Sequence, residues 1–376
     1  MKFSTLQENL KQGLFIASHV AGKNTNLPIL NNVLIEAKDG NIKLITTNLE
    51  VGIITTIRGK VEKDGSFAVD AKIFTDYVGL LANEKIDIDL KENKLNIEIE
   101  KNKTKITGQS PEEFPLIPVV SRDLYYSAKI EDFKKALLQV IFSVSTSESR
   151  IELSGVLFNF FNNKLIVAAT DSYRLAEKEI NIKTNKNDAE EKRVIIPAKT
   201  IQEVIRILGG GKDNEKAEGG EIKFYLSDNQ ILFVVGATEL VSRLIEGQYP
   251  DYKQIIPTTS KTNALINKTK LIRMIKIASL FSRANVNDVN LDFPIRKGQV
   301  IISSTSGQTG ENITEMEALV NGEDNGIVIN YRYLLDGLNN IEGDNVKLEI
   351  IDSNTPCVIR PEEEKNYLYI IMPIKQ

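Results

Sequence analysis

A pattern of extended and helical positions occurs three times along this chain. Each copy has about four extended residues, then a turn residue, then a short amphipathic helix, over 67–81, 194–208 and 327–341. The turn residues are Asp70, Pro197 and Asn330, so matching positions lie 127 and then 133 residues apart. A period of that length indicates tandem domains, because the repeats of solenoid proteins are only about 20–50 residues long.

A second pattern precedes the first in every copy. Apolar helices are predicted over 6–20, 130–144 and 268–281, and each is followed by two strands joined through a short turn. The strand pairs span 33–36 with 42–46, 156–160 with 165–169, and 289–293 with 300–303. The turns fall at Asp39-Gly40, Asn162-Asn163 and Lys297-Gly298, and Asn, Asp and Gly favour hairpins because they tolerate positive φ. Further hairpins are predicted at 85–100, 221–235 and 345–359.

The two patterns together predict an α+β fold with antiparallel sheets in three tandem domains, 1–122, 123–258 and 259–376. The length of 376 residues allows each domain its own core, and the hydrophobic fraction of 41% is ordinary for a globular protein. The single Cys357 excludes an intrachain disulfide and a multi-cysteine metal site, and it fits a reducing compartment. Glu8 and Lys11 interrupt the start where a signal peptide needs an apolar run, so we expect a cytoplasmic protein.

Charge is unevenly distributed between the predicted helices and strands. The formal net charge is −4, which alone argues weakly against nucleic acid as a partner. The helix over 268–281 nevertheless carries Lys268, Lys270, Arg273 and Lys276 and no acidic residue. The strands and their turns hold much of the acid: Asp87, Asp89, Glu92, Glu98, Glu100, Glu349, Asp352 and Glu362 to Glu364. A single basic helix is usually only a solvated face, but the repetition over several helices predicts one positive surface on an acidic protein.

Signatures of catalysis are missing from the sequence. The only histidine, His19, lies in an apolar helix and is expected to be a partly buried core residue, since a histidine catalyst needs a positioned partner. Gly209-Gly-Gly-Lys212 follows a helix and precedes Asp213, so it lacks the context of a phosphate-binding loop. No set of residues has metal-ligand spacing. We therefore expect no catalytic residue, no metal, no cofactor and no enzymatic activity of the chain itself.

Two segments suggest recognition instead. Thr170-Asp-Ser-Tyr-Arg-Leu175 combines a turn former with a tyrosine and an arginine, the residue types that dominate binding hot spots. A simple turn held by a salt bridge is the alternative at these positions. The chain ends on the apolar stretch 367–376, and a terminal strand of that kind is normally docked rather than frayed.

Several short motifs, in this order and spacing, carry a resemblance to a known family. They are Met1-Lys-Phe, Leu27-Pro-Ile-Leu30, Thr170 to Leu175, Tyr249-Pro-Asp-Tyr252 and Met372-Pro373. The chain resembles the bacterial DNA polymerase III β subunits, the sliding clamps, over essentially its whole length. The resemblance implies three tandem clamp domains with helices on one face of antiparallel sheets, and two chains that close head to tail into a six-domain ring around duplex DNA.

The resemblance also implies partners and positions for them. The partners are a second copy of the chain, double-stranded DNA without sequence preference, the replicative polymerase α subunit, the clamp loader and other clamp-motif proteins, with no membrane partner. The residues expected to face DNA are Lys11, Lys23, Lys72, Lys134, Lys135, Arg150, Lys199, Arg206, Lys268, Arg273, Lys276 and Arg332. The residues expected at the interface between the two chains are Thr104 and Ile106 on an edge strand of the first domain, and Leu280 and Phe281 in the third.

In this family, proteins dock through a peptide motif close to Gln-x-x-Leu-Phe, in a groove between the second and third domains. The matching positions are Leu153, Thr170, Ser172, Tyr173, Arg174, Leu175, Pro250, Ile255, Asn330, Tyr333, Ile370, Ile371, Met372, Pro373 and Ile374. The resemblance implies that Leu153, Leu175, Ile255 and Ile371 form an apolar floor. Arg174, Asn330 and the Met372 backbone would hold the polar groups of the peptide. Ser172-Tyr173 replaces a Gly-His pair of some members, so we expect a different rim.

Two other functions remain open from the residues alone. One is an enzyme on a triplicated α+β scaffold, which would need a cleft with perturbed acids or a metal. The other is a repeat scaffold that binds proteins and does not encircle DNA, which would tolerate neutralisation of the basic helix residues.

Overall fold

A computed structural model describes residues 1–22, 26–100, 102–147, 149–186, 191–210 and 220–375. Lys23, expected to face DNA, and Gly211-Lys212 of the glycine-rich loop at 209–212 lie outside the described residues. The chain forms two compact units, one within 1–131, 182–188 and 202–244, and the other within 132–181, 189–201 and 245–376. The middle repeat of the sequence therefore contributes to both units.

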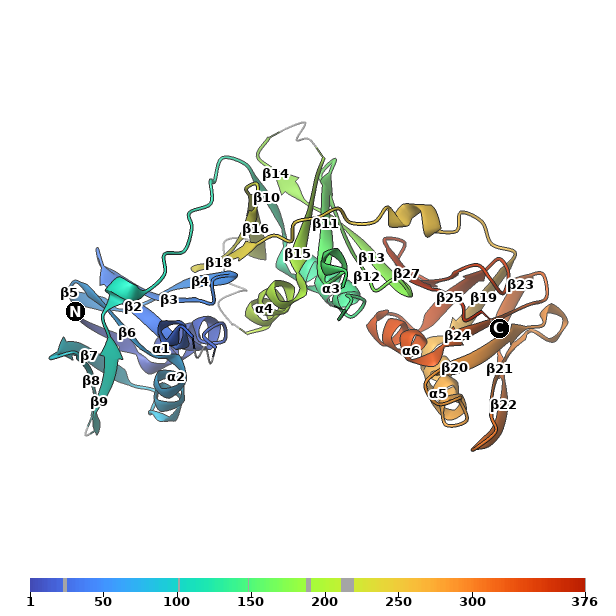
Figure 1. The fold of residues 1–376 in the computed structure, drawn as a ribbon, viewed down its shortest axis with the longest axis horizontal. Helices are drawn as coiled ribbons and strands as arrows, with labels where there is room; N and C mark the ends of the chain where they lie inside the picture. The colour runs from blue at the N-terminus through green and yellow to red at the C-terminus, as the bar shows by residue number, and fades with distance from the viewer. Residues whose placement is uncertain (23–25, 101, 148, 187–190, 211–219, 376) are drawn as a thin grey trace. The chain divides into compact units, whose positions relative to one another are not determined.

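The first unit is built on a 14-stranded antiparallel sheet in the order β14-β10-β16-β17-β18-β4-β3-β2-β6-β9-β8-β7-β1-β5 (Figure 1). The strands from the first repeat are β1 (Lys2–Leu6), β2 (Asn32–Lys38), β3 (Asn41–Thr47), β4 (Val51–Ile57), β5 (Lys60–Lys63), β6 (Gly65–Asp70), β7 (Lys85–Lys91), β8 (Lys94–Ile99) and β9 (Asn102–Gln109). Those from the second repeat are β10 (Tyr125–Lys129), β14 (Lys183–Thr184), β16 (Glu221–Leu226), β17 (Gln230–Val235) and β18 (Thr238–Arg243). The two sets join where β18 pairs with β4, so hydrogen bonds of the sheet cross the repeat boundary.

The second unit contains a nine-stranded sheet and a four-stranded sheet, also antiparallel, in the orders β15-β11-β12-β13-β27-β26-β25-β19-β23 and β22-β21-β20-β24. The nine strands are β11 (Gly155–Phe161), β12 (Lys164–Thr170), β13 (Arg174–Asn181), β15 (Lys192–Pro197), β19 (Thr262–Asn267), β23 (Leu319–Gly322), β25 (Asn345–Ile350), β26 (Cys357–Pro361) and β27 (Tyr367–Ile371). The four are β20 (Asp288–Phe293), β21 (Gln299–Ser306), β22 (Gly310–Glu317) and β24 (Asn325–Asn330). Here β13 of the second repeat pairs with the last strand, β27, which confirms the docked C-terminal strand.

Six α-helices are present in the described residues, two from each repeat. They are α1 (Gln7–Ala17), α2 (Ala71–Leu80), α3 (Ile130–Ile141), α4 (Ala198–Gly209), α5 (Lys268–Ser279) and α6 (Tyr331–Asn340). The short 3-10 helices are η1 (Pro28–Asn31), η2 (Pro111–Glu113), η3 (Ile151–Leu153), η5 (Tyr252–Ile255) and η6 (Ile295–Lys297). Helix α1 packs on β3 and β4, and α5 packs on β20 to β22, so each covers a face of its sheet.

The predicted turn residues do start the short helices. The Asp70 carboxylate accepts a hydrogen bond from the Ile73 amide at 2.7 Å, and the Asn330 side chain accepts one from Arg332 at 2.9 Å. Both satisfy amides that the first turn of a helix leaves without a partner. Pro197 instead ends β15 directly before α4.

The hairpin turns also match the sequence pattern, whereas the long helices end two or three residues earlier than predicted. Asp39, Asn162 and Asn163 have φ of 49°, 48° and 58°, the left-handed values expected of these residues. After α3 and α5 the chain tightens into bonds between residues three apart, as from the Phe281 amide to the Ala278 carbonyl at 3.0 Å, whereas α1 ends with the Ser18 amide bonded to the Leu14 carbonyl at 2.8 Å.

Close packing of α6 on β27 depends on a glycine. A Cβ atom at Gly337 would lie 2.2 Å from the ring of Tyr369, which is fully buried. Gly79 in α2 offers a comparison, because a Cβ atom at that position would meet nothing within 4 Å.

We therefore predict that Gly337→Ala lowers the free energy of unfolding by about 1–3 kcal/mol, because the added methyl forces the Tyr369 ring out of place. The matched control Gly79→Ala should be neutral or stabilising by up to about 1 kcal/mol, since alanine is the better helix former. Urea unfolding of the two variants measures the difference. Equal unfolding midpoints for both would contradict the packing described for α6.

Candidate functional site

The loop that joins β12 to β13 is built by its own side chains. The Thr170 hydroxyl donates to the Arg174 carbonyl at 2.6 Å and accepts from the Ser172 amide at 3.1 Å. One oxygen of Asp171 accepts from the amides of Tyr173 and Arg174, each at 3.0 Å. Ser172 has a φ of 80°, which these bonds hold in the left-handed region. The result is a tight turn that leaves Tyr173 63% exposed and directs Arg174 inward.

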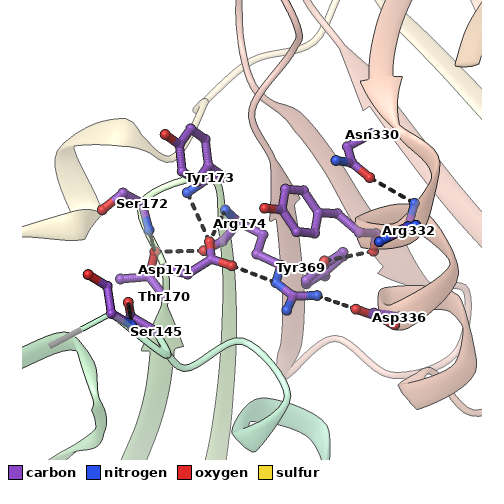
Figure 2. A network of polar contacts seen from close by, with 12 residues as sticks. Ser145, Thr170, Asp171, Ser172, Tyr173, Arg174, Asn330, Arg332, Asp336 and Tyr369 are labelled. Carbon is purple, nitrogen blue, oxygen red and sulfur yellow. Dashed lines mark hydrogen bonds and ion pairs between the residues drawn. The ribbon is translucent and has the colours of Figure 1, made fainter. Parts of the chain in front are cut away.

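Arg174 is the centre of a polar cluster between the second and third repeats (Figure 2). Its Nε donates to Asp171 at 2.9 Å and its Nη1 pairs with Asp336 on α6. The guanidinium carbon lies 4.6 Å from the centre of the Tyr333 ring and 5.6 Å from that of Phe142. The Arg174 side chain is only 11% exposed. Its positive charge is neutralised by the two acids and its guanidinium is shielded by the two rings.

The C-terminal segment closes the cluster from the other side. The Tyr369 hydroxyl donates to the Tyr333 carbonyl at 2.8 Å, and burial raises the pKa of that hydroxyl well above its ordinary value. Beyond β27 the Met372 amide donates to the Tyr173 carbonyl at 2.9 Å, and the Ile374 amide donates to Val328 at 2.8 Å. The chain therefore remains fixed to both repeats past the end of its last strand.

The structure brings together most of the residues that we expect to bind a peptide. Tyr173 and Tyr333 are stacked with ring centres 6.4 Å apart, above Arg174 and beside Met372. Leu153, Leu175, Ile370 and Ile371 are 1% exposed or less, so they lie beneath the surface. Leu175 and Ile370 share a core cluster with Tyr252, whose segment carries the exposed Ile255 and the predicted Pro250. Pro373 and Ile374 are half-buried.

The polar residues of the set already have partners within the chain. Arg174 already binds two carboxylates, the Asn330 side chain accepts from an α6 amide, and the Met372 amide is bonded to Tyr173. The segment 170–175 does form a turn with a salt bridge, and its part in recognition stays a prediction. Sequence reasoning missed Asp336 as a partner of Arg174; its position one turn after Tyr333 on the same face of α6 was the available signal.

A second buried cation lies four residues further along the same face of β13. Lys178 is 3% exposed and pairs with Glu364, while its ammonium also donates to Asn366 at 2.8 Å. Glu364 accepts in addition from Lys135 at 2.8 Å and from Gln139 at 3.3 Å. Burial lowers the pKa of Lys178. Burial alone would raise the pKa of Glu364, but hydrogen bonds from Lys135 and Lys178 outweigh it and lower that pKa.

The residues expected to face DNA differ in how exposed they are. The exposed ones are Lys11, Lys72, Arg150, Lys199, Arg273, Lys276 and Arg332, of which Lys72 pairs with Asp76 and Arg150 with Glu152, and Lys134 is half-buried. Three others contact groups from distant parts of the chain: Lys135 in the Glu364 cluster, Lys268 with the Ile341 carbonyl at 2.6 Å, and Arg206.

Arg206 joins α4 to the C-terminal end of α1. It donates to the carbonyls of Phe15 and Ile16 at 2.6 and 2.7 Å and lies 5.0 Å from the centre of the Phe15 ring. A cation at this position satisfies the carbonyls that a helix end leaves unpaired. Glu203 pairs with both Arg206 and His19. The prediction that His19 is a core residue is wrong, because α1 ends at Ala17 and the imidazole is 62% exposed.

Of the four residues expected between two chains, two lie on the edge strand β9 and two follow helix α5. Thr104 and Ile106 are on β9, which pairs with β8 over this stretch, whereas its pairing with β6 is confined to Gly108 and Gln109. On its other side β9 is therefore an open edge among the described residues. Leu280 is 70% exposed after α5, and Phe281 lies about 3.9 Å from the Cβ position of Gly310 at the start of β22, the edge strand of the four-stranded sheet.

The described residues contain no group of three or more acidic, histidine or cysteine side chains that could hold a metal ion. Among the same residues, no helix is long and apolar enough to cross a membrane. Cys357 is buried, and burial raises the pKa of its thiol to about 12, so the reactive thiolate is suppressed.

Comparison with known proteins gives a consistent result over the whole chain. Residues 1–118, 128–251 and 253–375 match the family models of the N-terminal, central and C-terminal domains of the DNA polymerase III beta subunit. Proteins named beta sliding clamp from Staphylococcus epidermidis and Staphylococcus aureus are 30% and 31% identical over 361 residues, which is 93% of this chain and of theirs.

Solved structures show the same relationship. The DNA polymerase III beta subunit of Thermotoga maritima has a TM-score of 0.90 at 26% identity, and the DNA polymerase sliding clamp of Bacillus subtilis has 0.92 at 25%. In each case the match covers 100% of this chain and 99% of the other.

The buried cluster at Lys178 supplies a stability test. Glu364→Gln leaves Lys178 buried without its counter-charge and should lower the free energy of unfolding by about 3 kcal/mol. Lys178→Met should cost about 1 kcal/mol or less, because methionine fills a similar volume and Glu364 keeps Lys135 and Gln139.

Glu342→Gln is the matched control, since Glu342 also pairs with Lys135, at 2.8 Å, but is 67% exposed. Urea unfolding should give this variant the midpoint of the unsubstituted protein. If Glu364→Gln were as stable as Glu342→Gln, the cluster would not hold a charged lysine.

Proposed function

The chain belongs to the DNA polymerase III beta subunit family, the bacterial sliding clamps, and on that premise we propose how it carries out this function. Two copies close head to tail into a ring around duplex DNA, slide along it without sequence preference, and tether the replicative polymerase. The observation that carries the proposal is that the three clamp domains follow one another in order along the whole chain. As a clamp, the chain is a non-catalytic subunit, and DNA synthesis belongs to the polymerase complex.

The two open edges support closure of the ring. Along β9 the exposed charges are Lys103 and Lys105, and along β22 they are Glu311, Glu315 and Glu317. A strand edge rich in lysine and one rich in glutamate complement each other, and pairing them in a dimer removes both from solvent.

Exposed apolar side chains occur in the same two repeats as these edges. Ile73 and Leu80 of α2 are 59% and 88% exposed, and Leu280 and Ile313 are 70% and 66% exposed. We propose that these side chains cover one another in the dimer, together with Thr104, Ile106 and Phe281. The exposed apolar residues of α2 and the acidic β22 extend the interface expected from the sequence.

The closed ring and weak contacts from a positively charged inner surface would keep the protein on DNA. We propose that the exposed bases of α1, α2, α4, α5 and α6 face the duplex, because a dense line of phosphates attracts them without reading sequence. The closed ring prevents lateral escape, so the contacts need not be strong. Lys135, Lys268 and Arg206 contribute less, since their charges are already engaged within the chain.

We propose that the cluster around Arg174 is the groove for the partner peptides. The replicative polymerase α subunit, the clamp loader and other clamp-motif proteins would dock there, with the segment over Tyr173 and Tyr333 as its rim. An apolar base with few polar points suits a short peptide with aliphatic and aromatic anchors.

The domain boundaries proposed for the clamp are 1–122, 123–258 and 259–376, and its proposed location is the cytoplasm, where replication takes place. A protein-binding scaffold that does not encircle DNA is the second candidate, and neutralisation of the basic helix residues distinguishes the two.

Leu280→Asp should separate the two chains, because it places a charge in the proposed apolar contact. Sedimentation should show one chain where the unsubstituted protein shows two. Leu319→Asp is the control, since Leu319 is 67% exposed in the same unit but lies on β23. Dissociation by both substitutions, or by neither, would contradict the interface.

Alanine at Lys11, Lys199, Arg273 and Lys276 together should weaken binding to duplex DNA and flatten its dependence on salt. The slope of log affinity against log salt should fall by about 0.9 for each phosphate that the protein no longer neutralises. The control replaces four exposed lysines outside the helices: Lys60, Lys94, Lys192 and Lys261. Anisotropy of a labelled duplex at low salt measures both. An unchanged slope in the helix variant would favour the scaffold that does not bind DNA.

A further inference from the structure

We infer that Asp336 selects a hydrogen-bond donor on the bound partner segment, and that Arg174 is the positioning residue that holds Asp336 in place. The inference rests on the proposed peptide groove and assigns the chemistry that this groove prefers. It differs from the role that resemblance gives to Arg174, which would contact the peptide itself.

Arg174 has little left to offer a ligand. Two of its nitrogens are bound to Asp171 and Asp336, and the rings of Tyr333 and Phe142 lie on the guanidinium. A guanidinium has five N–H donors, of which these bonds use two, but the Arg174 side chain is only 11% exposed, so little of the remainder is open to a peptide. Its direct effect in this structure is to fix the positions of the two acids.

The two acids are not equivalent. Asp171 is 15% exposed, and its oxygens accept from Arg174 Nε and from the amides of Tyr173 and Arg174. Asp336 is 48% exposed and uses only Oδ2, for Arg174. No described residue donates to its Oδ1, so this oxygen is an acceptor without a donor on a side chain that is half-exposed.

Asp336 forms no second ion pair among the described residues. Arg174 balances one of the two acids, which leaves one negative charge on the group. Arg332, one turn earlier on α6, keeps its positive charge but is directed to Tyr331: it donates to the Tyr331 hydroxyl at 3.5 Å and lies 6.0 Å from the centre of that ring. Arg150 on the other side is paired with Glu152 at 3.1 Å.

A half-exposed carboxylate with one free oxygen and a net negative charge favours a donor over an acceptor. The partner class that fits is a peptide with apolar anchors and a carboxamide, lysine or arginine placed to reach Asp336. An acidic side chain at the same place would meet like charge.

The test is a thermodynamic cycle between Asp336 and the charge of the peptide. The probe is a labelled peptide Gln-Ala-Ala-Leu-Phe, with lysine or glutamate substituted in turn at each of its first three positions. Dissociation constants are measured by fluorescence anisotropy on the unsubstituted protein, on Asp336→Asn and on the control Glu342→Gln. Asparagine keeps an oxygen for Arg174 and removes the charge; Asp336→Ser gives the same readout should the amide variant fail to fold.

At the peptide position that reaches Asp336, the ratio of the dissociation constants of the glutamate and lysine peptides should fall about threefold or more in Asp336→Asn. The same ratio should not change in Glu342→Gln. An equal change for all peptides, or no change, would overturn the inference and leave Asp336 with a structural role only. If the unsubstituted protein bound none of the peptides, the proposed groove would fail together with the inference, and the two failures are therefore distinguishable.

Discussion

Strand pairing across the boundaries between repeats is the constraint on which the rest of this protein depends. Each repeat alone would leave open sheet edges, and such edges invite unwanted pairing. The pairing of β18 with β4 joins the first two repeats into one 14-stranded sheet, and the pairing of β13 with β27 joins the last two into one of nine strands. Backbone ladders are insensitive to side-chain identity, so this architecture persists among relatives that share about 30% of their residues.

The same pairing creates the candidate binding site. Arg174 and Lys178 lie on one face of β13 opposite Ile371 and Tyr367 of β27, and both cations are bound by acids of the third repeat. A buried ion pair adds little net stability, because desolvation offsets the attraction, but it strongly disfavours any arrangement that separates the partners. Two such pairs, four residues apart, therefore fix the junction and position the loop that presents Tyr173.

Local patterns made the elements predictable, whereas partners distant in sequence were not. The turn at Asn162-Asn163 and the cap at Asp70 follow from the preferences of those residues and were predicted from the sequence. Arg206 binds a helix end about 190 residues away in the sequence. The residues around Arg206 therefore indicated only an exposed basic side chain. Asp336 was missed for the same reason: its role depends on an arginine 162 residues earlier. His19 was misplaced because the helical pattern continued beyond the point where the backbone leaves the helix.

The central claim is that two copies of this chain close into a ring wide enough for duplex DNA. Negative-stain electron microscopy of the purified protein tests it most directly. The account predicts a closed annulus of two chains, with pseudo-sixfold averages from six similar domains and a hole wider than a duplex of roughly 20 Å. Compact or elongated particles without a hole would contradict it and would favour a scaffold that does not encircle DNA.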